Sequence, residues 1–408
     1  MTETDPFDSR YSWLRLGLTL LIGVVGNVGM WAIIVILPEV QAEFGSGRAA
    51  ASMPYTTTMI GFALGNLMIG RAVDRFGITW ALCAAAVLSA VGYLLAAVAP
   101  TMAVLSLVQL LVGFGTAASF GPLIADVSLW FQRRRGIAVA IAASANYLSG
   151  AIWPILIRSV ATDADWRAVY GILAVLTLAA ILPAAQFLRR RVPPEALAAA
   201  DTATIARRGE TGFTPRQFTW LLGLAGIGCC VAMSMPQVHI VALCVDYGFG
   251  AAAGAEMLSL MLLGGVASRI VSGLLSDRLG GIRTLLIGST LQCIALFLYL
   301  PAGGLVSLYV VSLIFGLSQG GIVPAYAVIV REYLPAREAG ARVGFVMMLT
   351  ILGMALGGWM TGVIYDLTGS YQWAFVNGIV WNGLNIAIMV VILTRGRRLP
   401  GRSVPATA

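Results

Sequence analysis

Arg269 is the residue whose type and position say most about chemistry. It lies within an apolar stretch, 254–276, about eight residues or roughly 12 Å from the nearer end. If that stretch crosses a bilayer, a charge at that depth costs at least about 2.5 to 3.5 kcal/mol, so the side chain must face a cavity or a partner. A guanidinium is a planar fork of donors that matches a carboxylate. Arg269 is therefore predicted to anchor an anionic group.

The alternative for Arg269 is a structural ion pair with an acidic side chain. Asp126, in another apolar stretch, is the main candidate for that partner. It lies only a few residues from Trp130 and the arginines that follow, so we expect it to pair with Arg133 or Arg135 instead. This leaves anchoring as the favoured role of Arg269.

Other polar side chains also interrupt the apolar stretches. His239 is the only histidine. Because an imidazole titrates near neutral pH, it could carry a proton, and the alternative is a hydrogen-bonded packing residue. Every such group, Gln319 included, must find a partner or line water in a medium without bulk hydrogen bonding. The further candidates for a substrate-binding set are Asn27, Asn146, Tyr147, Gln237 and Tyr326, with the aromatic Phe120.

The elements that position these residues are membrane spans. The chain has 408 residues and is 59% hydrophobic and 11% charged, whereas soluble domains carry roughly 25% charge. One span needs about 20 apolar residues, so the length suits twelve spans joined by short loops. We predict an all-α polytopic membrane protein with 12 transmembrane helices. Their expected ranges are 13–37, 50–71, 79–99, 102–129, 135–158, 167–188, 217–242, 254–276, 282–301, 304–331, 338–364 and 372–394.

The arginines predict the orientation of the chain. Of the 26 basic residues, all arginine, Arg48, Arg158 and Arg167 fall on one side, Arg269 falls inside a span, and the remaining 22 fall on the other side. The protein is then expected to be a multi-pass protein of the cell (inner) membrane. The positive-inside rule places both of its termini in the cytoplasm. The net charge of +8 is spread over short connections and forms no basic face, so we expect no nucleic-acid partner.

The two halves of the chain repeat each other. Gly70-Arg-Ala-Val-Asp-Arg-Phe-Gly77 recurs as Gly273-Leu-Leu-Ser-Asp-Arg-Leu-Gly280, 203 residues later. A second echo, a Phe-Gly pair followed by a proline, recurs near 114–122 and 315–324. We therefore predict two six-helix, pseudo-symmetric bundles. The predicted units are a first bundle at 1–188, a cytoplasmic linker at 189–216, a second bundle at 217–395 and a cytoplasmic tail at 396–408.

The paired GxxxDRxG string resembles the loop signature of the major facilitator superfamily, and the resemblance covers essentially the whole chain. Glycines let helices approach closely, and the acid and arginine can make charge-assisted bonds at a helix end. A cytoplasmic gate is the expected role, with a solvated loop as the alternative. The predicted gate residues are Asp74, Arg75, Asp277 and Arg278.

Within that superfamily, the string from Trp130 to Gly150 and the string from Val238 to Gly248 look like bacterial monocarboxylate carriers, including the oxalate/formate group. The resemblance implies that Arg269 binds the substrate carboxylate and that Phe120 and Tyr326 face the substrate. The core-packing alternative for both aromatics stays open. Two features depart from the pattern of those carriers: Gly265 stands where many have an aspartate used in proton transfer, and the chain has no lysine in helix 1. Proton coupling therefore stays open.

The favoured function is a secondary active transporter that moves a small organic anion, a monocarboxylate, by alternating access. The alternative is a drug or multisubstrate efflux carrier, against which stand Gln109, where exporters usually have an arginine, and the lack of a GPxxGG string. A receptor or a membrane enzyme is less favoured, because no signalling domain or catalytic cluster stands out. We expect no cofactor, no metal site and no nucleotide loop. The expected partners are the anion, the lipid bilayer and, if coupled, protons, in a monomeric protein.

Overall fold

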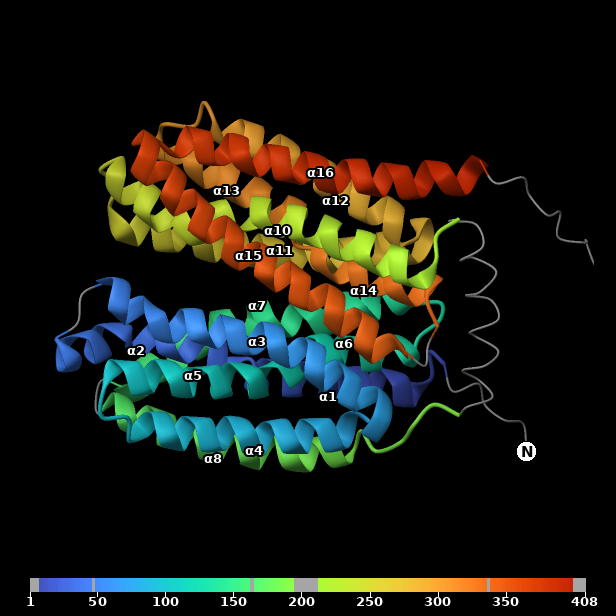
Figure 1. Ribbon diagram of the computed structural model, residues 1–408, viewed down its shortest axis with the longest axis horizontal. Helices are drawn as coiled ribbons and strands as arrows, with labels where there is room; N and C mark the ends of the chain where they lie inside the picture. The colour runs from blue at the N-terminus through green and yellow to red at the C-terminus, as the bar shows by residue number, and fades with distance from the viewer. Residues whose placement is uncertain (1–6, 46–47, 162–164, 194–211, 336–337, 399–408) are drawn as a thin grey trace, which may run out of the picture.

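The computed structural model describes residues 7–45, 48–161, 165–193, 212–335 and 338–398, and these residues form helices without strands (Figure 1). The first half contains α1 (Arg10–Gly26), α2 (Val28–Phe44), α3 (Arg48–Phe76), α4 (Ile78–Ala97), α5 (Met102–Thr116), the 3-10 turn η1 (Ala117–Ser119), α6 (Gly121–Leu129), α7 (Arg135–Ala161) and α8 (Trp166–Gln186). The second half contains α10 (Pro215–Asp246), α11 (Gly250–Leu279), α12 (Gly281–Tyr299), α13 (Leu305–Gln319), α14 (Ile322–Tyr333), α15 (Ala339–Thr368) and α16 (Tyr371–Arg398).

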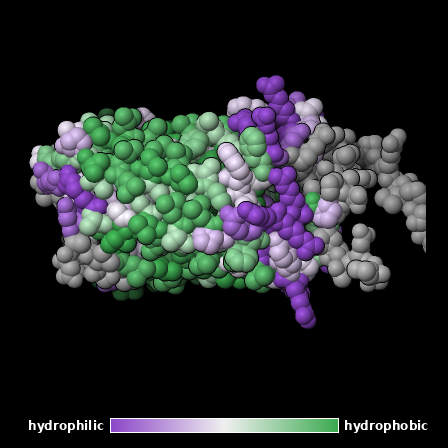
Figure 2. All heavy atoms as spheres, turned by 90° about the horizontal axis from the view of Figure 1, so that it is seen from below, coloured by the Kyte–Doolittle hydropathy of each residue, from purple (hydrophilic) through white to green (hydrophobic). Residues whose placement is uncertain are grey.

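The helices lie side by side in two bundles, one from each half, so the predicted fold class is confirmed. Within the described ranges, 11 helical segments are long and apolar enough to cross a membrane. One of the twelve predicted spans, at 50–71, corresponds to α3 and is not among these 11 segments. It carries polar side chains such as Thr58 and Asn66. Figure 2 shows an apolar band across the middle of the visible face, with polar residues at both ends. That band is the surface expected of a membrane protein.

Three spans that were expected to be continuous are broken. The span at 13–37 breaks at Asn27, whose side-chain amide donates to the carbonyls of Gly23, at 2.7 Å, and Ser119, at 3.1 Å. The span at 102–129 passes through η1, and the span at 304–331 breaks at 320–321. Pro122 and Pro324 follow these last two breaks, and a proline lacks the N–H that a continuous helix needs. The interruptions therefore have local causes.

One end of the molecule carries the start of the linker, and we call it the linker end. Arg191 of the linker donates to the Phe76 carbonyl, at 2.6 Å, and the backbone N–H of Asp8 donates to the Trp130 carbonyl, at 3.0 Å. The N-terminal segment, the end of α3 and the start of the linker therefore meet there (Figure 1). Residues 194–211 of the predicted linker and 399–408 of the predicted tail lie outside the described residues, while α16 continues past the predicted boundary at 395.

A buried ion pair at the linker end corrects one prediction. Asp126 pairs with Arg15 of α1, and not with Arg133 or Arg135. Both bonds from the Arg15 guanidinium, through Nε and Nη2, are 2.9 Å long. The pairing was missed because α1 and α6 meet only in the tertiary structure.

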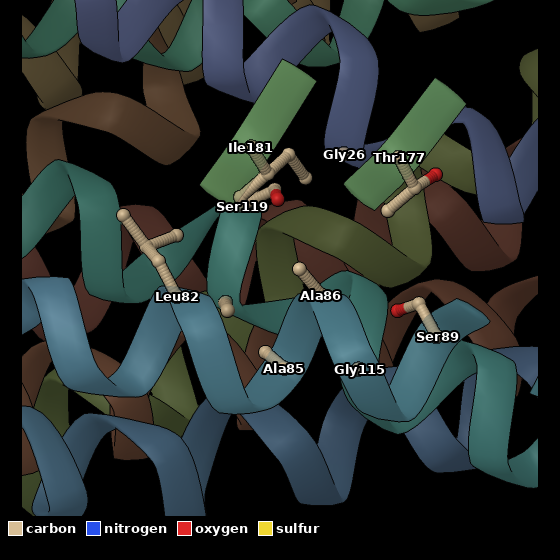
Figure 3. A pocket seen from close by; sticks show the side chains of 10 residues that line it. Gly26, Leu82, Ala85, Ala86, Ser89, Gly115, Ser119, Thr177 and Ile181 are labelled. Carbon is tan, nitrogen blue, oxygen red and sulfur yellow. The ribbon is translucent and has the colours of Figure 1, made fainter. Parts of the chain in front are cut away.

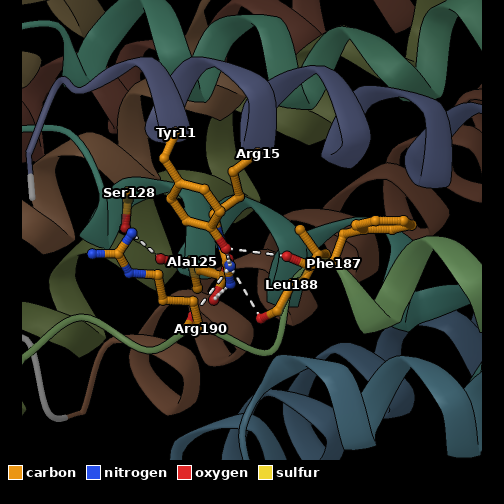
Figure 4. Close-up of polar contacts among 8 residues, drawn as sticks. Tyr11, Arg15, Ala125, Ser128, Phe187, Leu188 and Arg190 are labelled. Carbon is orange, nitrogen blue, oxygen red and sulfur yellow. Dashed lines mark hydrogen bonds and ion pairs between the residues drawn. The ribbon is translucent and has the colours of Figure 1, made fainter.

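The rest of the Arg15 guanidinium is also engaged (Figure 4). Its Nη1 donates to the carbonyls of Leu188, at 3.0 Å, and Arg190, at 3.2 Å. Its central carbon, Cζ, lies 4.7 Å from the centroid of the Trp130 ring. Arg15 thus joins α1, α6 and the first residues of the linker, and each nitrogen of its guanidinium has a partner.

Candidate functional site

The most extensive contacts between the two halves are those of α3 with α15 and of α7 with α11. Glycines make the contact possible. A Cβ atom on Gly70 would lie 2.4 Å from the Gly340 carbonyl oxygen, and one on Gly136 would lie 2.4 Å from the Gly273 carbonyl oxygen. Real Cβ atoms essentially never approach that closely. Both seams between the halves therefore depend on glycine at the linker end.

The acidic residues of the repeated motif lie in these seams. The Asp74 carboxylate accepts hydrogen bonds from the backbone N–H groups of Gly340, at 2.9 Å, and Ala341, at 2.7 Å, in the first turn of α15. The Asp277 carboxylate accepts from the N–H groups of Gly136 and Ile137, in the first turn of α7. Each half thus supplies a carboxylate to a helix start in the other half.

A helix start suits a carboxylate because its first N–H groups have no partner within the helix and carry a partial positive charge. The two arginines of the motif, Arg75 and Arg278, are exposed, and the Arg75 guanidinium lies 5.1 Å from the ring centroid of its neighbour Phe76. The gate role of all four residues stays a prediction. The observed contacts make the acids, rather than the arginines, the groups that bridge the halves.

Gly70→Ala is expected to hold the halves apart at the linker end. Overpacking of this kind costs about 1–3 kcal/mol, so the closed arrangement of α3 on α15 should lose at least about fivefold in relative population. Gly17→Ala is the control, because a Cβ on Gly17 meets nothing within 4 Å. The measurement is the distance between spin labels at the exposed Arg71 and Arg216, one in each half. Identical distance distributions in the two variants would contradict the role of Gly70.

Arg269 lies in the α7–α11 seam and is 3% exposed. Its Nε donates to the Gly320 carbonyl in its own half, at 3.0 Å. Its Nη1 donates to the Ala143 carbonyl of α7, in the other half, at 2.6 Å. The guanidinium carbon lies 3.5 Å from the centroid of the Tyr147 ring, one turn further along α7. In the described part of the chain no carboxylate forms an ion pair with Arg269.

Gly265 has no side chain and therefore leaves room for the Tyr147 ring. A Cβ on Gly265 would lie 2.7 Å from Cε2 of Tyr147. The position that departs from the monocarboxylate-carrier pattern is therefore filled by an aromatic ring from the opposite half. A larger residue at 265 would displace the ring that covers Arg269.

Several predicted site residues form a polar group next to Arg269. The Tyr147 hydroxyl donates to Oε1 of Gln319, at 3.3 Å, and accepts a long bond from Nε2 of Gln237, at 3.5 Å. On the adjacent position of α7, Asn146 donates to Oδ1 of Asn27, at 3.3 Å, at the break between α1 and α2. The structure thus joins Arg269, Tyr147 and Gln237 in one group and Asn146 and Asn27 in another.

The other three predicted residues have partners elsewhere. Nε2 of His239 lies 2.9 Å from the Gly358 carbonyl oxygen. Tyr326 is fully buried and donates to Oδ1 of Asn385, at 2.8 Å. The Phe120 ring lies 5.9 Å from the Phe62 ring, centroid to centroid. Their roles towards a substrate stay predictions.

Two groups that contact this site were not predicted from the sequence. The carbonyls of Ala143 and Gly320 are backbone atoms, and no side-chain type marks them. The Gly320-Gly321 pair ahead of Pro324 was the available signal for an irregular backbone at that point. A third contact, Gln319, is one of the polar side chains that were expected to need a partner, but it was not among the predicted site residues.

Two cavities lie away from this group. One, of about 10 Å³, lies inside the first half and is lined by small residues and the hydroxyls of Ser89, Ser119 and Thr177 (Figure 3). It has room for roughly one water molecule. The other, of about 160 Å³, is an apolar groove between α7 and α8, next to Trp153. Neither is lined by Arg269 or Tyr147.

Comparisons with known proteins agree with this architecture. A family model described as Major Facilitator Superfamily matches residues 19–306 and 222–408. Monocarboxylate transporter 13 of Bos taurus is 27% identical over 385 residues, which is 92% of this chain and 87% of that protein. Monocarboxylate transporter 11 of Homo sapiens is 28% identical over 385 residues, 91% of this chain and 80% of that protein. Among solved structures, the human organic anion transporter MFSD10 superposes with a TM-score of 0.76 at 15% identity, covering 93% of this chain and 99% of that one.

Proposed function

Because the chain belongs to the Major Facilitator Superfamily, we propose that it is a secondary carrier for a small organic anion with a single carboxylate, working by alternating access. The observation that carries the substrate class is Arg269. It is a buried cation between the two halves whose guanidinium is held by two neutral carbonyls and an aromatic ring. A cation at such depth favours an anionic ligand.

The surroundings of Arg269 suit one carboxylate on a small or aromatic body. The nearby polar groups are neutral amides and a phenol, from Gln237, Gln319 and Tyr147. They can orient a carbonyl or hydroxyl group of the substrate, but they add no second charge. Two similar proteins carry the name monocarboxylate transporter, which supports the same substrate class.

We further propose that the linker end faces the cytoplasm and that Asp74 and Asp277 close it. The arginine distribution supports this orientation, because the linker end holds the arginine-rich connections. The cross-half contacts of both acids lie at that end. The described arrangement is then the state in which the cytoplasmic side is shut.

Uptake into proteoliposomes tests the substrate class. We expect radiolabelled acetate, lactate, pyruvate or benzoate to enter faster than into protein-free vesicles, and the matching neutral amides to show no carrier-dependent uptake. The amide keeps the shape of each acid and removes the charge that Arg269 would bind. Equal carrier-dependent uptake of acid and amide would refute the proposal. Repeating the assay with an imposed pH gradient decides whether protons are coupled.

A further inference from the structure

We propose that the substrate carboxylate takes the place of the Ala143 carbonyl on Arg269, so that binding removes a tie between the halves and favours opening of the linker end. This inference rests on the proposed function, because it needs an anion at Arg269. It adds how binding there would be linked to movement of the bundles.

The two carbonyls on Arg269 belong to different moving bodies. Gly320 lies in the second half with Arg269, so their bond is kept whichever way the halves rock. Ala143 lies on α7 in the first half, so the bond from Nη1 exists only while α7 and α11 are close. Arg269 therefore joins the two halves by a hydrogen bond, in addition to being the candidate binding group for the substrate carboxylate.

The two carbonyls also differ in what they lose without Arg269. In a helix a carbonyl accepts from the N–H four residues later. For Gly320 that residue is Pro324, which has no N–H, so the arginine supplies the missing donor. For Ala143 that residue is Tyr147, within the continuous helix α7, which can satisfy the carbonyl by itself. Releasing Ala143 therefore leaves no buried acceptor without a donor, whereas releasing Gly320 would.

A substrate carboxylate can displace the Ala143 carbonyl from Arg269. A bidentate carboxylate needs two neighbouring N–H groups of the guanidinium. With Nε retained by Gly320, the end formed by Nη1 and Nη2 is the edge that remains for it, and Nη1 holds the Ala143 carbonyl. The bond from Nη1 to the Ala143 carbonyl has a charge on the donor alone, whereas a carboxylate brings a charge of its own and accepts two parallel bonds. The substrate would thus replace the weaker acceptor.

The bond between Arg269 and the Ala143 carbonyl joins α7 and α11, the same two helices that Asp277 links at the linker end. Towards the linker end, the same seam between α7 and α11 holds Gly136 against Gly273, and Asp277 against the start of α7. Loss of the Ala143 bond takes one contact from the set that keeps this seam shut. A ligand that binds only after that loss shifts the population towards the open linker end.

The test measures the distance between spin labels at Arg71 and Arg216, in a background without the five native cysteines. Acetate, lactate, pyruvate and benzoate are added in turn, each with its neutral amide as control. In the unchanged protein we expect a transported carboxylate to raise the ratio of open to closed linker ends about tenfold, and the amide to leave it unchanged.

The variant Arg269→Met distinguishes the two roles of Arg269, which are the hydrogen bond that joins the halves and the binding of the substrate carboxylate. Without ligand, its linker end should already be more open than in the unchanged protein, and no carboxylate should change it further. Ser268→Ala, its neighbour on α11, is the matched control and should behave like the unchanged protein. If Arg269→Met does not fold, Arg269→Lys replaces it, with a smaller shift in the same direction, because an ammonium lacks the fork that spans two carbonyls.

The outcomes distinguish the two proposals. In one outcome, the Arg269 variant keeps the ligand-free distance distribution of the unchanged protein and loses only its response to carboxylates. That result would contradict the role of Arg269 in joining the halves and would leave the proposed anion transport intact. A shifted distribution with a normal carboxylate response would overturn the anchor. If none of the four acids changes the distribution of the unchanged protein although proteoliposomes take up at least one of them, this inference fails and the proposed substrate class stands. If none of them is taken up either, the substrate class fails and this inference fails with it.

Discussion

Arg269→Met should lower the initial rate of carboxylate uptake by roughly 30-fold or more at concentrations below saturation. Removing one partner of a buried, hydrogen-bonded charge pair typically costs about 2–5 kcal/mol, and every 1.4 kcal/mol is about a factor of ten. The methionine keeps the length and apolar contacts of the arginine stem but leaves the substrate carboxylate without its cation. The measurement is uptake of the radiolabelled acid into proteoliposomes.

Two further variants control this result. Arg269→Lys keeps the charge without the fork and should lose less activity than Arg269→Met. Ser268→Ala should transport normally, because its side chain takes no part in the group around Arg269. The anchor hypothesis fails if Arg269→Met, shown to be folded by gel filtration, transports at the rate of the unchanged protein.

Arg15→Met should destabilise the fold strongly. Removing one member of a buried ion pair costs about 3–5 kcal/mol, because the remaining charge is left without a partner. The pair qualifies as buried, since the Arg15 and Asp126 side chains are 1% and 9% exposed. The variant also loses the bonds to the carbonyls of Leu188 and Arg190. We expect a clear fall in the thermal unfolding midpoint in detergent.

The double variant Arg15→Met with Asp126→Leu provides the control. It removes both charges together, and such replacements are often neutral or even stabilising. Most of the lost stability should therefore return. If the double variant is less stable than Arg15→Met alone, the stranded charge is not the cause of the destabilisation.

Much of the fold could be predicted from the sequence. Apolar stretches of about 20 residues can hardly be anything but membrane helices, because a bilayer leaves no other way to satisfy the backbone. The repeated Gly-Asp-Arg string indicated two related halves, and both bundles are present. The breaks at Asn27 and at 320–321 were missed, because hydropathy reports burial in lipid and not the continuity of a helix.

The site was predictable only in part. Arg269 stood out because the cost of burying its charge depends on the residue and its depth, both of which are visible in the sequence. The partner of Asp126 was assigned to nearby arginines, although Arg15 lies 111 residues away in sequence. Proximity along the chain was the only information available, and it pointed to the wrong helix end.

The sequence by itself determined that this chain spans a membrane with paired halves and one deeply placed cation. Only the tertiary structure decided what that cation touches: the Ala143 carbonyl across the seam, the Gly320 carbonyl beside a proline, and the Tyr147 ring that Gly265 admits. The reason is physical. Burial costs belong to individual residues and their local apolar surroundings, whereas contacts between helices depend on how two bundles pack, and backbone carbonyls are the same at every position.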